Sequence, residues 1–288
     1  MATNDFKCRF CSVCLGYGCI GQLPGMGGVN GSRNFILNCA GWDKLPADTT
    51  ISVLPEHIGI APVTGAVQNI GYSKEEDFYL PYFTAAKESG IAICVGDGAP
   101  DEKLMLGIKA VRELNEKAYF FFKPYPDERI YERIEWAEGL AHAIGMDIDA
   151  YNIITMRNQA KLERKSAHQI AEIRKRAAVP FIIKGVFTED DIRMCEETLP
   201  DIIVVSNHGG RVDTEEGSTA EFLQKNASRL LRCCGELWVD GGIRKARDIQ
   251  AALTAGAKKC LVGRPFLASL ANGDILEMKR TAASFLHV

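Results

Sequence analysis

The sequence predicts an α/β protein folded as one (β/α)8 barrel, a TIM barrel. Short apolar runs rich in β-branched residues alternate with amphipathic helical segments along most of the 288 residues, which is the pattern of a parallel sheet covered by helices. Three of the later runs end in turns of glycine and charged residues, as the active-site loops of such barrels do. The length also suits one barrel of ~250 residues and leaves too little chain for a large second domain.

The expected strands follow one another in chain order. They lie at 58–63, 91–95, 118–122, 151–155, 179–186, 202–206, 237–240 and 259–262. The expected helices include those at 32–39, 127–144, 166–177, 245–257 and, after the last strand, 266–286. We therefore divide the chain into an N-terminal cysteine-containing segment, 1–45, and a barrel, 46–288.

The charge and hydropathy of the chain exclude some classes of partner. The formal net charge is -3, so we expect no general affinity for nucleic acid or for an anionic membrane. No apolar run approaches the ~18 residues of a membrane span, and the N-terminus lacks a basic region followed by an apolar core. We expect a cytoplasmic protein.

A histidine and an arginine share the turn after the sixth expected strand. The turn reads Ser206-Asn207-His208-Gly209-Gly210-Arg211. Histidine can take a proton near neutral pH, and arginine can hold a carboxylate or phosphate through two parallel hydrogen bonds. The two glycines allow a sharp turn and a close approach to a ligand. We expect His208 to act as a base and Arg211 to bind an anion; the alternative is a core histidine beside a surface arginine.

The next two expected strands also end in glycine and arginine. One is followed by Asp240-Gly241-Gly242-Ile243-Arg244 and the other by Gly263-Arg264. Backbone N–H groups and guanidinium groups at two consecutive strand ends form a cup for a phosphate. In (β/α)8 barrels the last two loops commonly bind phosphate in this way. A ligand that carries a phosphate is therefore expected at the C-terminal end of the barrel.

These motifs resemble those of the FMN-dependent α-hydroxy acid oxidases and dehydrogenases, such as glycolate oxidase, lactate oxidase, flavocytochrome b2 and mandelate dehydrogenase. The similarity rests on 206–211, 240–244, 262–267 and the lysine-containing run 181–186. The resemblance implies that FMN binds at the C-terminal face of the barrel and that the protein is an oxidoreductase acting on a small 2-hydroxy acid. It also implies a homo-oligomer, since family members are often tetramers.

The resemblance assigns roles to particular residues. Arg211, together with Arg164, would hold the substrate carboxylate while His208 removes a proton. Lys184 would stabilise negative charge at the N1–C2=O edge of the reduced flavin, which agrees with the cost of burying a lysine in an apolar strand without an anion. The residues expected to contact the flavin are Pro62, Val63, Thr64, Thr155, Lys184, Ser206, Asp240, Gly241, Gly242, Arg244, Gly263 and Arg264.

The second and third expected strands depart from the family pattern. Gly96-Asp97-Gly98 stands where many members have two serines and a tryptophan, so the pocket is either wider or filled from elsewhere. Phe121-Phe122-Lys123 stands where members commonly have Gln-Leu-Tyr. Phe121 can only pack, whereas Lys123 offers a cation at the position of a tyrosine that binds substrate. Lys123 is either a substrate-binding residue or a solvated surface lysine.

The fourth expected strand departs further. Arg157 stands where the family has an aspartate paired with its histidine. A carboxylate beside an imidazole favours the protonated ring, and a guanidinium disfavours it. If Arg157 faces His208, hydroxy acid oxidation is impaired or differently tuned; otherwise another acid, such as Asp213, takes the role.

Four cysteines lie close together near the N-terminus, at Cys8, Cys11, Cys14 and Cys19. In a chain without a secretion signal this spacing indicates an iron–sulfur cluster or a zinc ion more than disulfides. The alternative is a flexible tail of reduced thiols. The other six cysteines lie in apolar segments and are expected to be small core residues.

Two other functions are compatible with these residues. The substitutions at 121, 123 and 157 favour a flavin enzyme of another class, such as a reductase or an isomerase that uses reduced FMN. A site without substrate contacts would instead favour a non-catalytic flavin-binding or redox-sensing protein.

Overall fold

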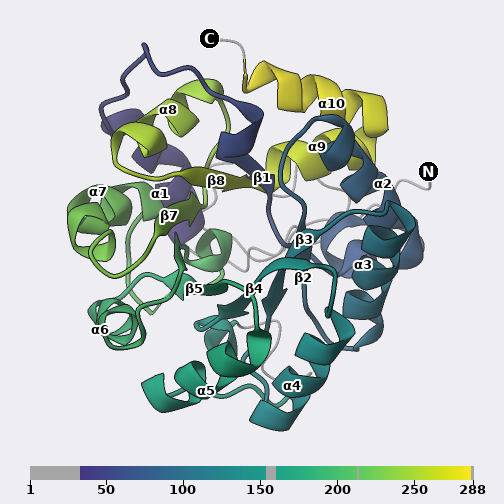
Figure 1. Ribbon diagram of the computed structural model, residues 1–288. Helices are drawn as coiled ribbons and strands as arrows, with labels where there is room; N and C mark the ends of the chain where they lie inside the picture. The colour runs from purple at the N-terminus through teal and green to yellow at the C-terminus, as the bar shows by residue number, and fades with distance from the viewer. Residues whose placement is uncertain (1–32, 154–159, 213, 287–288) are drawn as a thin grey trace.

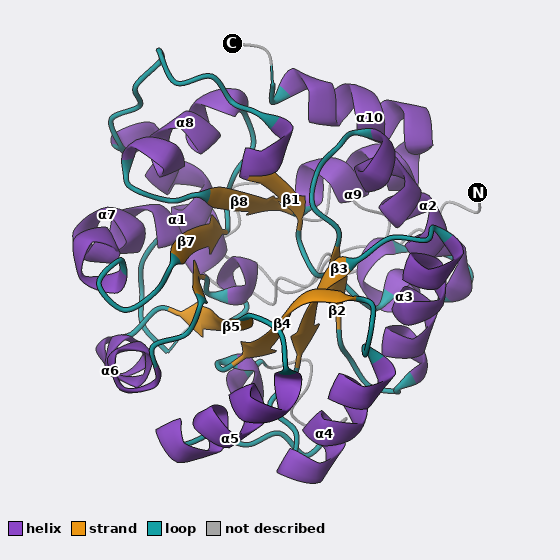
Figure 2. Cartoon of the chain, in the orientation of Figure 1, coloured by secondary structure: helices purple, strands orange, loops and turns teal. Residues whose placement is uncertain are grey.

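The computed structural model describes residues 33–153, 160–212 and 214–286. It confirms the predicted (β/α)8 barrel, since eight parallel strands form a central ring and the helices lie outside it (Figures 1 and 2). Neighbouring strands follow the order β1-β8-β7-β6-β5-β4-β3-β2. An isolated parallel bridge between Gly59 in β1 and Ala92, just before β2, nearly closes the ring.

The strands are short and almost entirely buried. They are β1 (Ile58–Ile60), β2 (Cys94–Gly96), β3 (Ala118–Phe122), β4 (Ala141–Asp147), β5 (Phe181–Val186), β6 (Ile202–Val205), β7 (Glu236–Asp240) and β8 (Lys259–Val262). Strands β3 and β8 have the predicted bounds, and all the others except β4 overlap their predictions. A parallel strand covered on both faces is a continuous apolar run, which is why these strands are visible in the sequence.

The helices cover the outside of the ring. The α-helices are α1 (Arg33–Gly41), α2 (Glu76–Glu88), α3 (Glu102–Glu113), α4 (Asp127–Trp136), α5 (Ala167–Ala177), α6 (Glu189–Thr198), α7 (Thr219–Leu230), α8 (Ala246–Thr254), α9 (Arg264–Asn272) and α10 (Ile275–Ser284). Short helical turns lie at η2 (Trp42–Lys44), η3 (Pro55–His57), η4 (Ala66–Ile70), η5 (Ala150–Asn152) and η7 (His208–Gly210).

Local signals determine where some of these helices begin. The Ser166 hydroxyl accepts a hydrogen bond from the backbone N of Gln169 at 3.2 Å, and the Gln169 side chain accepts one from the backbone N of Ser166 at 3.1 Å. Thr188 and Asp191 form the same capping box at the start of α6. Each cap of this kind contributes ~1 kcal/mol, so both helix starts are encoded locally.

The prediction for the fourth strand is wrong. The helix expected over 127–144 ends as α4 at Trp136, and Gly139 follows with a φ of 75°. The chain then forms β4 over Ala141–Asp147, paired with β3 and β5, and residues 151–152 of the predicted strand belong to the turn η5. A short apolar run that is buried on both faces has no period that distinguishes a strand from a buried helix.

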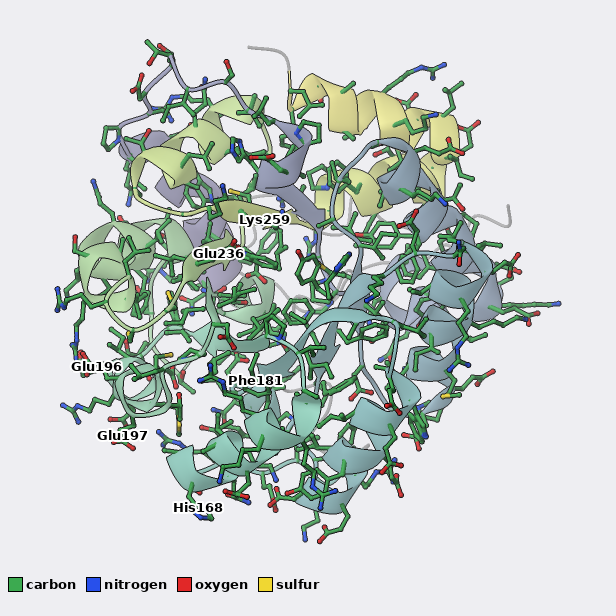
Figure 3. All side chains as sticks on the ribbon, viewed as in Figure 1. His168, Phe181, Glu196, Glu197, Glu236 and Lys259 are labelled. Atoms are coloured by element: carbon green, nitrogen blue, oxygen red, sulfur yellow. The ribbon has the colours of Figure 1, made fainter. Side chains whose placement is uncertain are left out.

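Side chains fill the N-terminal end of the barrel. Trp238 of β7 is fully buried, and its Nε1 donates a hydrogen bond to Glu236 Oε2 at 2.8 Å. Lys259 Nζ lies 5.4 Å from the centre of the Trp238 ring. Glu236 and Lys259 are the first residues of β7 and β8 and are labelled in Figure 3. The pocket described below lies at the opposite end of the strands.

Helix α1 lies across the loops that follow β6 and β7. Asn38 Nδ2 donates a hydrogen bond to Asn207 Oδ1 at 2.7 Å. A Cβ at Gly210 or Gly242 would overlap the backbone of α1, and both glycines have a positive φ. These glycines therefore allow α1 to pack closely on the two loops, in addition to permitting the turns themselves.

The six cysteines from Cys39 onward lie in or beside the core, as predicted; five are buried and Cys234 is partly buried. Cys8, Cys11, Cys14 and Cys19 lie outside the described residues, so their metal site stays a prediction. Within 33–153, 160–212 and 214–286, no group of histidine, cysteine or acidic side chains could hold a metal ion. No helix in this described part is long and apolar enough to cross a membrane.

Candidate active site

A pocket opens at the C-terminal ends of the strands. Its walls come from the turns after β1, β2, β3, β4, β6, β7 and β8, from Lys184 in β5 and from Phe35 in α1. Its empty volume, counting the open mouth, is about 1270 Å³. A pocket lined by loops at this end of a barrel is where enzymes of this fold bind their cofactors and substrates.

His208 lies in the turn after β6 with a φ of 53°. The Asn207 side chain caps this turn by accepting a hydrogen bond from the backbone N of Gly210 at 2.9 Å. The imidazole lies between two carboxylates: Nδ1 is 2.8 Å from Asp149 Oδ2, and Nε2 is 3.2 Å from Asp147 Oδ2. Both acids come from the end of β4, so the fourth and sixth strands together orient the ring.

Gly185 makes room for one of these acids. A Cβ at this position would overlap the Asp149 carboxylate. Gly185 has a φ of 97°, and the pairing of β5 with β6 shifts in register between Lys184 and Val186. The glycine is therefore required both by the backbone conformation and by the neighbouring side chain.

Lys123 is a buried residue of the pocket wall, only 8% exposed. Its Nζ donates a hydrogen bond to Asp147 Oδ2 at 2.6 Å and lies 3.4 Å from His208 Nε2. Its backbone N donates to Asp97 Oδ2 at 3.1 Å, and Arg133 Nε donates to the same oxygen at 2.9 Å. Burial raises the pKa of Asp97, and the charge of Arg133 opposes that effect. The turns after β2 and β3 are thus joined beside the pocket.

Lys184 is buried in β5, as predicted for a lysine with an anion partner. Its Nζ is 3.3 Å from both Asp147 Oδ1 and Asp240 Oδ2, and it donates a hydrogen bond to Ser206 Oγ at 3.1 Å. Burial alone would lower the pKa of Lys184, but the neighbouring carboxylates outweigh it and raise the pKa. Burial would raise the pKa of Asp147, but Lys123 and Lys184 hold it well below its usual value. Lys184 and Asp147 are therefore both charged at neutral pH.

These ion pairs form one cluster of charged groups, which we call the charge cluster. Its members are Lys123, Asp147, Asp149, Lys184, His208 and Asp240. With a neutral imidazole the carboxylates outnumber the cations by one, and a protonated imidazole balances the charge. The two carboxylates beside the ring are placed to stabilise the positive charge of an imidazole that takes a proton from a ligand.

Arg211 lines the same pocket, three residues after His208. No carboxylate in the described ranges pairs with its guanidinium, and burial lowers its pKa. Taking a guanidinium out of water without an anion is unfavourable, and a ligand carboxylate would supply two parallel hydrogen bonds. The pocket therefore has an anion clamp beside its histidine.

The turns after β7 and β8 form a second place for an anion. Helix α9 begins at Arg264 directly after Gly263, both residues line the pocket, and helix N-termini attract anions. Arg264 lies 4.2 Å from the centre of the Phe35 ring, which orients its guanidinium. Among the described residues, Arg244 Nε and Asp240 Oδ1 are buried without a hydrogen-bond partner. A phosphate can accept from the first and a ribityl hydroxyl can donate to the second, so these residues fit FMN.

The structure brings most of the predicted site residues together. Those that line the pocket are Pro62, Val63, Thr64, Lys123, Lys184, His208, Arg211, Asp240, Gly241, Gly242, Arg244, Gly263 and Arg264. Ser206 lies behind Lys184, fully buried. Arg164 does not line the pocket: its side chain is 55% exposed and lies 3.6 Å from Asp190. The position of Arg164 therefore does not support its predicted contact with substrate. Thr155, predicted to contact the flavin, lies outside the described residues.

Asp147 and Asp149 are functional residues that were not predicted from the sequence. Of the two alternatives for the partner of His208, the structure supports an acid, and the acids beside the ring are Asp147 and Asp149. A signal was present: the apolar run before Asp147 ends in an acid in the same way as the run before Asp240. Arg157 was assigned this position because the fourth strand was misplaced, and both Arg157 and the alternative acid Asp213 lie outside the described residues.

Known proteins are similar to the chain in sequence. It is 30% identical to the L-lactate oxidase of Lactobacillus jensenii over 210 residues, which are 70% of this chain and 45% of that protein. It is 37% identical to the L-lactate dehydrogenase (cytochrome) of Saccharomyces cerevisiae over 102 residues, which are 34% of this chain and 17% of that protein. The chain thus spans less than half the length of either relative.

Solved structures share the fold. A crystal structure of mandelate oxidase with 3,3-difluoro-2-hydroxy-3-phenylpropionic acid matches with a TM-score of 0.73 at 20% identity, covering 93% of this chain and 88% of that chain. The family model described as FMN-dependent dehydrogenase matches residues 107–284. This range holds strands β3 to β8 and every member of the charge cluster. Because it also makes up more than half of the sequence, the chain belongs to the FMN-dependent dehydrogenase family.

Proposed function

We propose that the protein is an FMN-dependent oxidoreductase that oxidises a small 2-hydroxy acid to the corresponding 2-oxo acid. One observation carries the proposal: His208, held between two carboxylates, shares a pocket with Arg211, whose guanidinium has no carboxylate partner in the part of the chain described. A proton acceptor and a carboxylate clamp are the two groups that a 2-hydroxy acid requires. The sequence similarity to the lactate-oxidising relatives supports the same substrate class.

The residues that would hold FMN lie around one side of the pocket. Arg264, with the backbone at Gly242 and Gly263, would bind the phosphate, and Asp240 would accept from the ribityl chain. Lys184 is charged and would face the N1–C2=O edge of the ring. Bound FMN supplies the acceptor for the two electrons and one proton that the substrate gives up.

Arg211 and His208 would carry the protein's part of the reaction. Arg211 binds the carboxylate and thereby fixes the orientation of the 2-hydroxyl group. As the C2–O bond becomes C=O, the substrate loses two electrons and two protons, and His208 Nε2 takes one of these protons. The resulting imidazolium completes the charge balance of the cluster. Lys123 Nζ, 3.4 Å from Nε2, is near enough to contact a substrate oxygen bound there.

The test is to mix the protein with each of a panel of 2-hydroxy acids under anaerobic conditions and to monitor flavin reduction by stopped-flow absorption. We expect at least one to reduce the flavin, and His208→Gln to keep FMN while losing ~10²–10⁴-fold in rate, the usual contribution of a general base. Arg211→Lys should mainly weaken substrate binding, because an ammonium does not reproduce the bidentate fork. A flavin that no hydroxy acid reduces would contradict the proposal.

A second candidate is a reductase or isomerase that uses reduced FMN. It is favoured by Lys123, which stands in the pocket where relatives have a tyrosine, and by Phe121, which is fully buried and offers no hydrogen bond. The same experiment separates the two functions, because this candidate predicts no reduction by any hydroxy acid.

A further inference from the structure

A second cation that has no partner among the described residues stands in the pocket. Lys103 is the second residue of α3 and lines the pocket wall. Its ammonium has no hydrogen bond or ion pair with any described residue. Of the two acids directly before it, Glu102 is exposed, and Asp101 is engaged by Arg129 at 2.6 Å and by Arg133 at 2.5 Å. The acidic side chains at the N-terminus of α3 therefore do not pair with the Lys103 ammonium.

Gly98 lets the Lys103 side chain reach this position. A Cβ at Gly98 would lie 3.2 Å from Cδ of Lys103 and 2.9 Å from Oγ1 of Thr64, so the lysine stem passes directly over the glycine. All three residues line the pocket. The space above Gly98, where a bulky family residue is missing, is thus occupied in part by a lysine.

Lys103 and Arg211 lie on opposite sides of the barrel mouth. Lys103 follows β2 and Arg211 follows β6, and in the ring of eight strands these two are four strands apart in either direction. Figure 1 shows α3 and α7, which follow the same strands, on opposite sides of the barrel. A molecule that touches both residues must therefore extend across the pocket.

The acids of the pocket wall are already paired. Asp97 binds Arg133 and Asp240 binds Lys184. One ligand carboxylate satisfies Arg211, which leaves Lys103 to attract a second anion into a partly desolvated site. Arg244 and Arg264 are assigned to the FMN phosphate, so Lys103 and Arg211 remain to bind two separate anionic groups of a substrate.

We infer that the substrate is a 2-hydroxy dicarboxylic acid, with its 2-hydroxy carboxylate on Arg211 and its distal carboxylate on Lys103. The inference rests on the proposed oxidation of hydroxy acids and adds the substrate class to it. Oxidation follows the same balance, two electrons and two protons lost at C2, and the distal carboxylate takes no part in it. Lys103 is thus a residue of substrate specificity.

Binding of 2-oxo acids, which cannot reduce the flavin, tests the inference without turnover. FMN-loaded protein is titrated with 2-oxoglutarate and with 2-oxopentanoate, equal in chain length, and Kd is measured from the change in flavin absorption. We expect the dicarboxylate to bind about 10-fold more tightly or better, the effect of one charge-assisted hydrogen bond. Lys103→Met should remove this difference and leave binding of the monocarboxylate unchanged, while Lys103→Arg should retain it.

Lys109→Met is the matched control, since Lys109 is exposed on the same helix and does not line the pocket. Reduction rates with 2-hydroxyglutarate and 2-hydroxypentanoate should show the same preference. Equal affinity for the two oxo acids in the unmodified protein, or a preference that survives Lys103→Met, overturns the inference while the proposed function stands. If no hydroxy acid reduces the flavin, the proposed function fails, and the oxo acid titration still decides the role of Lys103.

Discussion

Replacing Asp149 by Asn tests the link between the charge cluster and the proposed base. Asp149 Oδ2 is 2.8 Å from His208 Nδ1, so the carboxylate stabilises the imidazolium that forms when the ring takes a proton. A unit charge at about 4 Å contributes about 4 kcal/mol at an effective dielectric constant of about 20. Loss of that charge corresponds to about 10³-fold in rate, within the ~10²–10⁴ range of general-base catalysis. Because Asp147 still faces Nε2, we take this value as the upper limit.

The assay is the rate of flavin reduction at a saturating concentration of the best hydroxy acid, under anaerobic conditions. FMN content should not change, since Asp149 does not line the pocket. Asp190→Asn is the control, because Asp190 is a carboxylate on the surface, 60% exposed and paired with Arg164. Reduction by Asp149→Asn at a rate within a few-fold of the unmodified protein would refute the role of the acid and of the charge balance.

Three further predictions concern the same framework. Gly185→Ala should displace the Asp149 carboxylate and lower the reduction rate as Asp149→Asn does, with additional loss of stability because of the positive φ; a rate equal to the unmodified protein would contradict the packing argument. The pKa of Asp147 is depressed in the folded state, so its contribution to stability is present above the ordinary value near ~3.9 and is lost as the pH falls through the depressed value. Between pH 6 and pH 3 the urea midpoint of Asp147→Asn should therefore fall less than that of the unmodified protein. The substitution itself should lower the free energy of unfolding by ~3–5 kcal/mol, because it leaves two buried lysines without this anion. Parallel pH profiles of the two proteins would exclude the linkage. Metal analysis with thiol counting on anaerobic protein should find iron and sulfide, or zinc, bound by the N-terminal cysteines, whereas four freely titratable thiols and no metal would leave a cysteine-bearing tail. These cysteines are Cys8, Cys11, Cys14 and Cys19.

The sequence by itself determined the barrel and the residues that follow its later strands. Buried parallel strands are apolar runs, and their functional turns stand out because glycine and charged residues interrupt those runs. His208, Arg211 and Lys184 are visible for this reason, and so are the glycines and arginines after β7 and β8. Each of these signals is contained within a few neighbouring residues.

Only the tertiary structure decided which charges meet. The apolar run of β4 does not distinguish a strand from a helix. The role of Asp147 and Asp149 is recognised only from their contacts with His208, about sixty residues further along the chain. Lys123 is compatible with a surface position until Asp147 is seen 2.6 Å away, and Arg164, which resembles a substrate ligand in sequence, faces solvent instead. Such pairings depend on the packing of distant strands. The residues next to a charged side chain in the sequence therefore do not show which distant residue will pair with it.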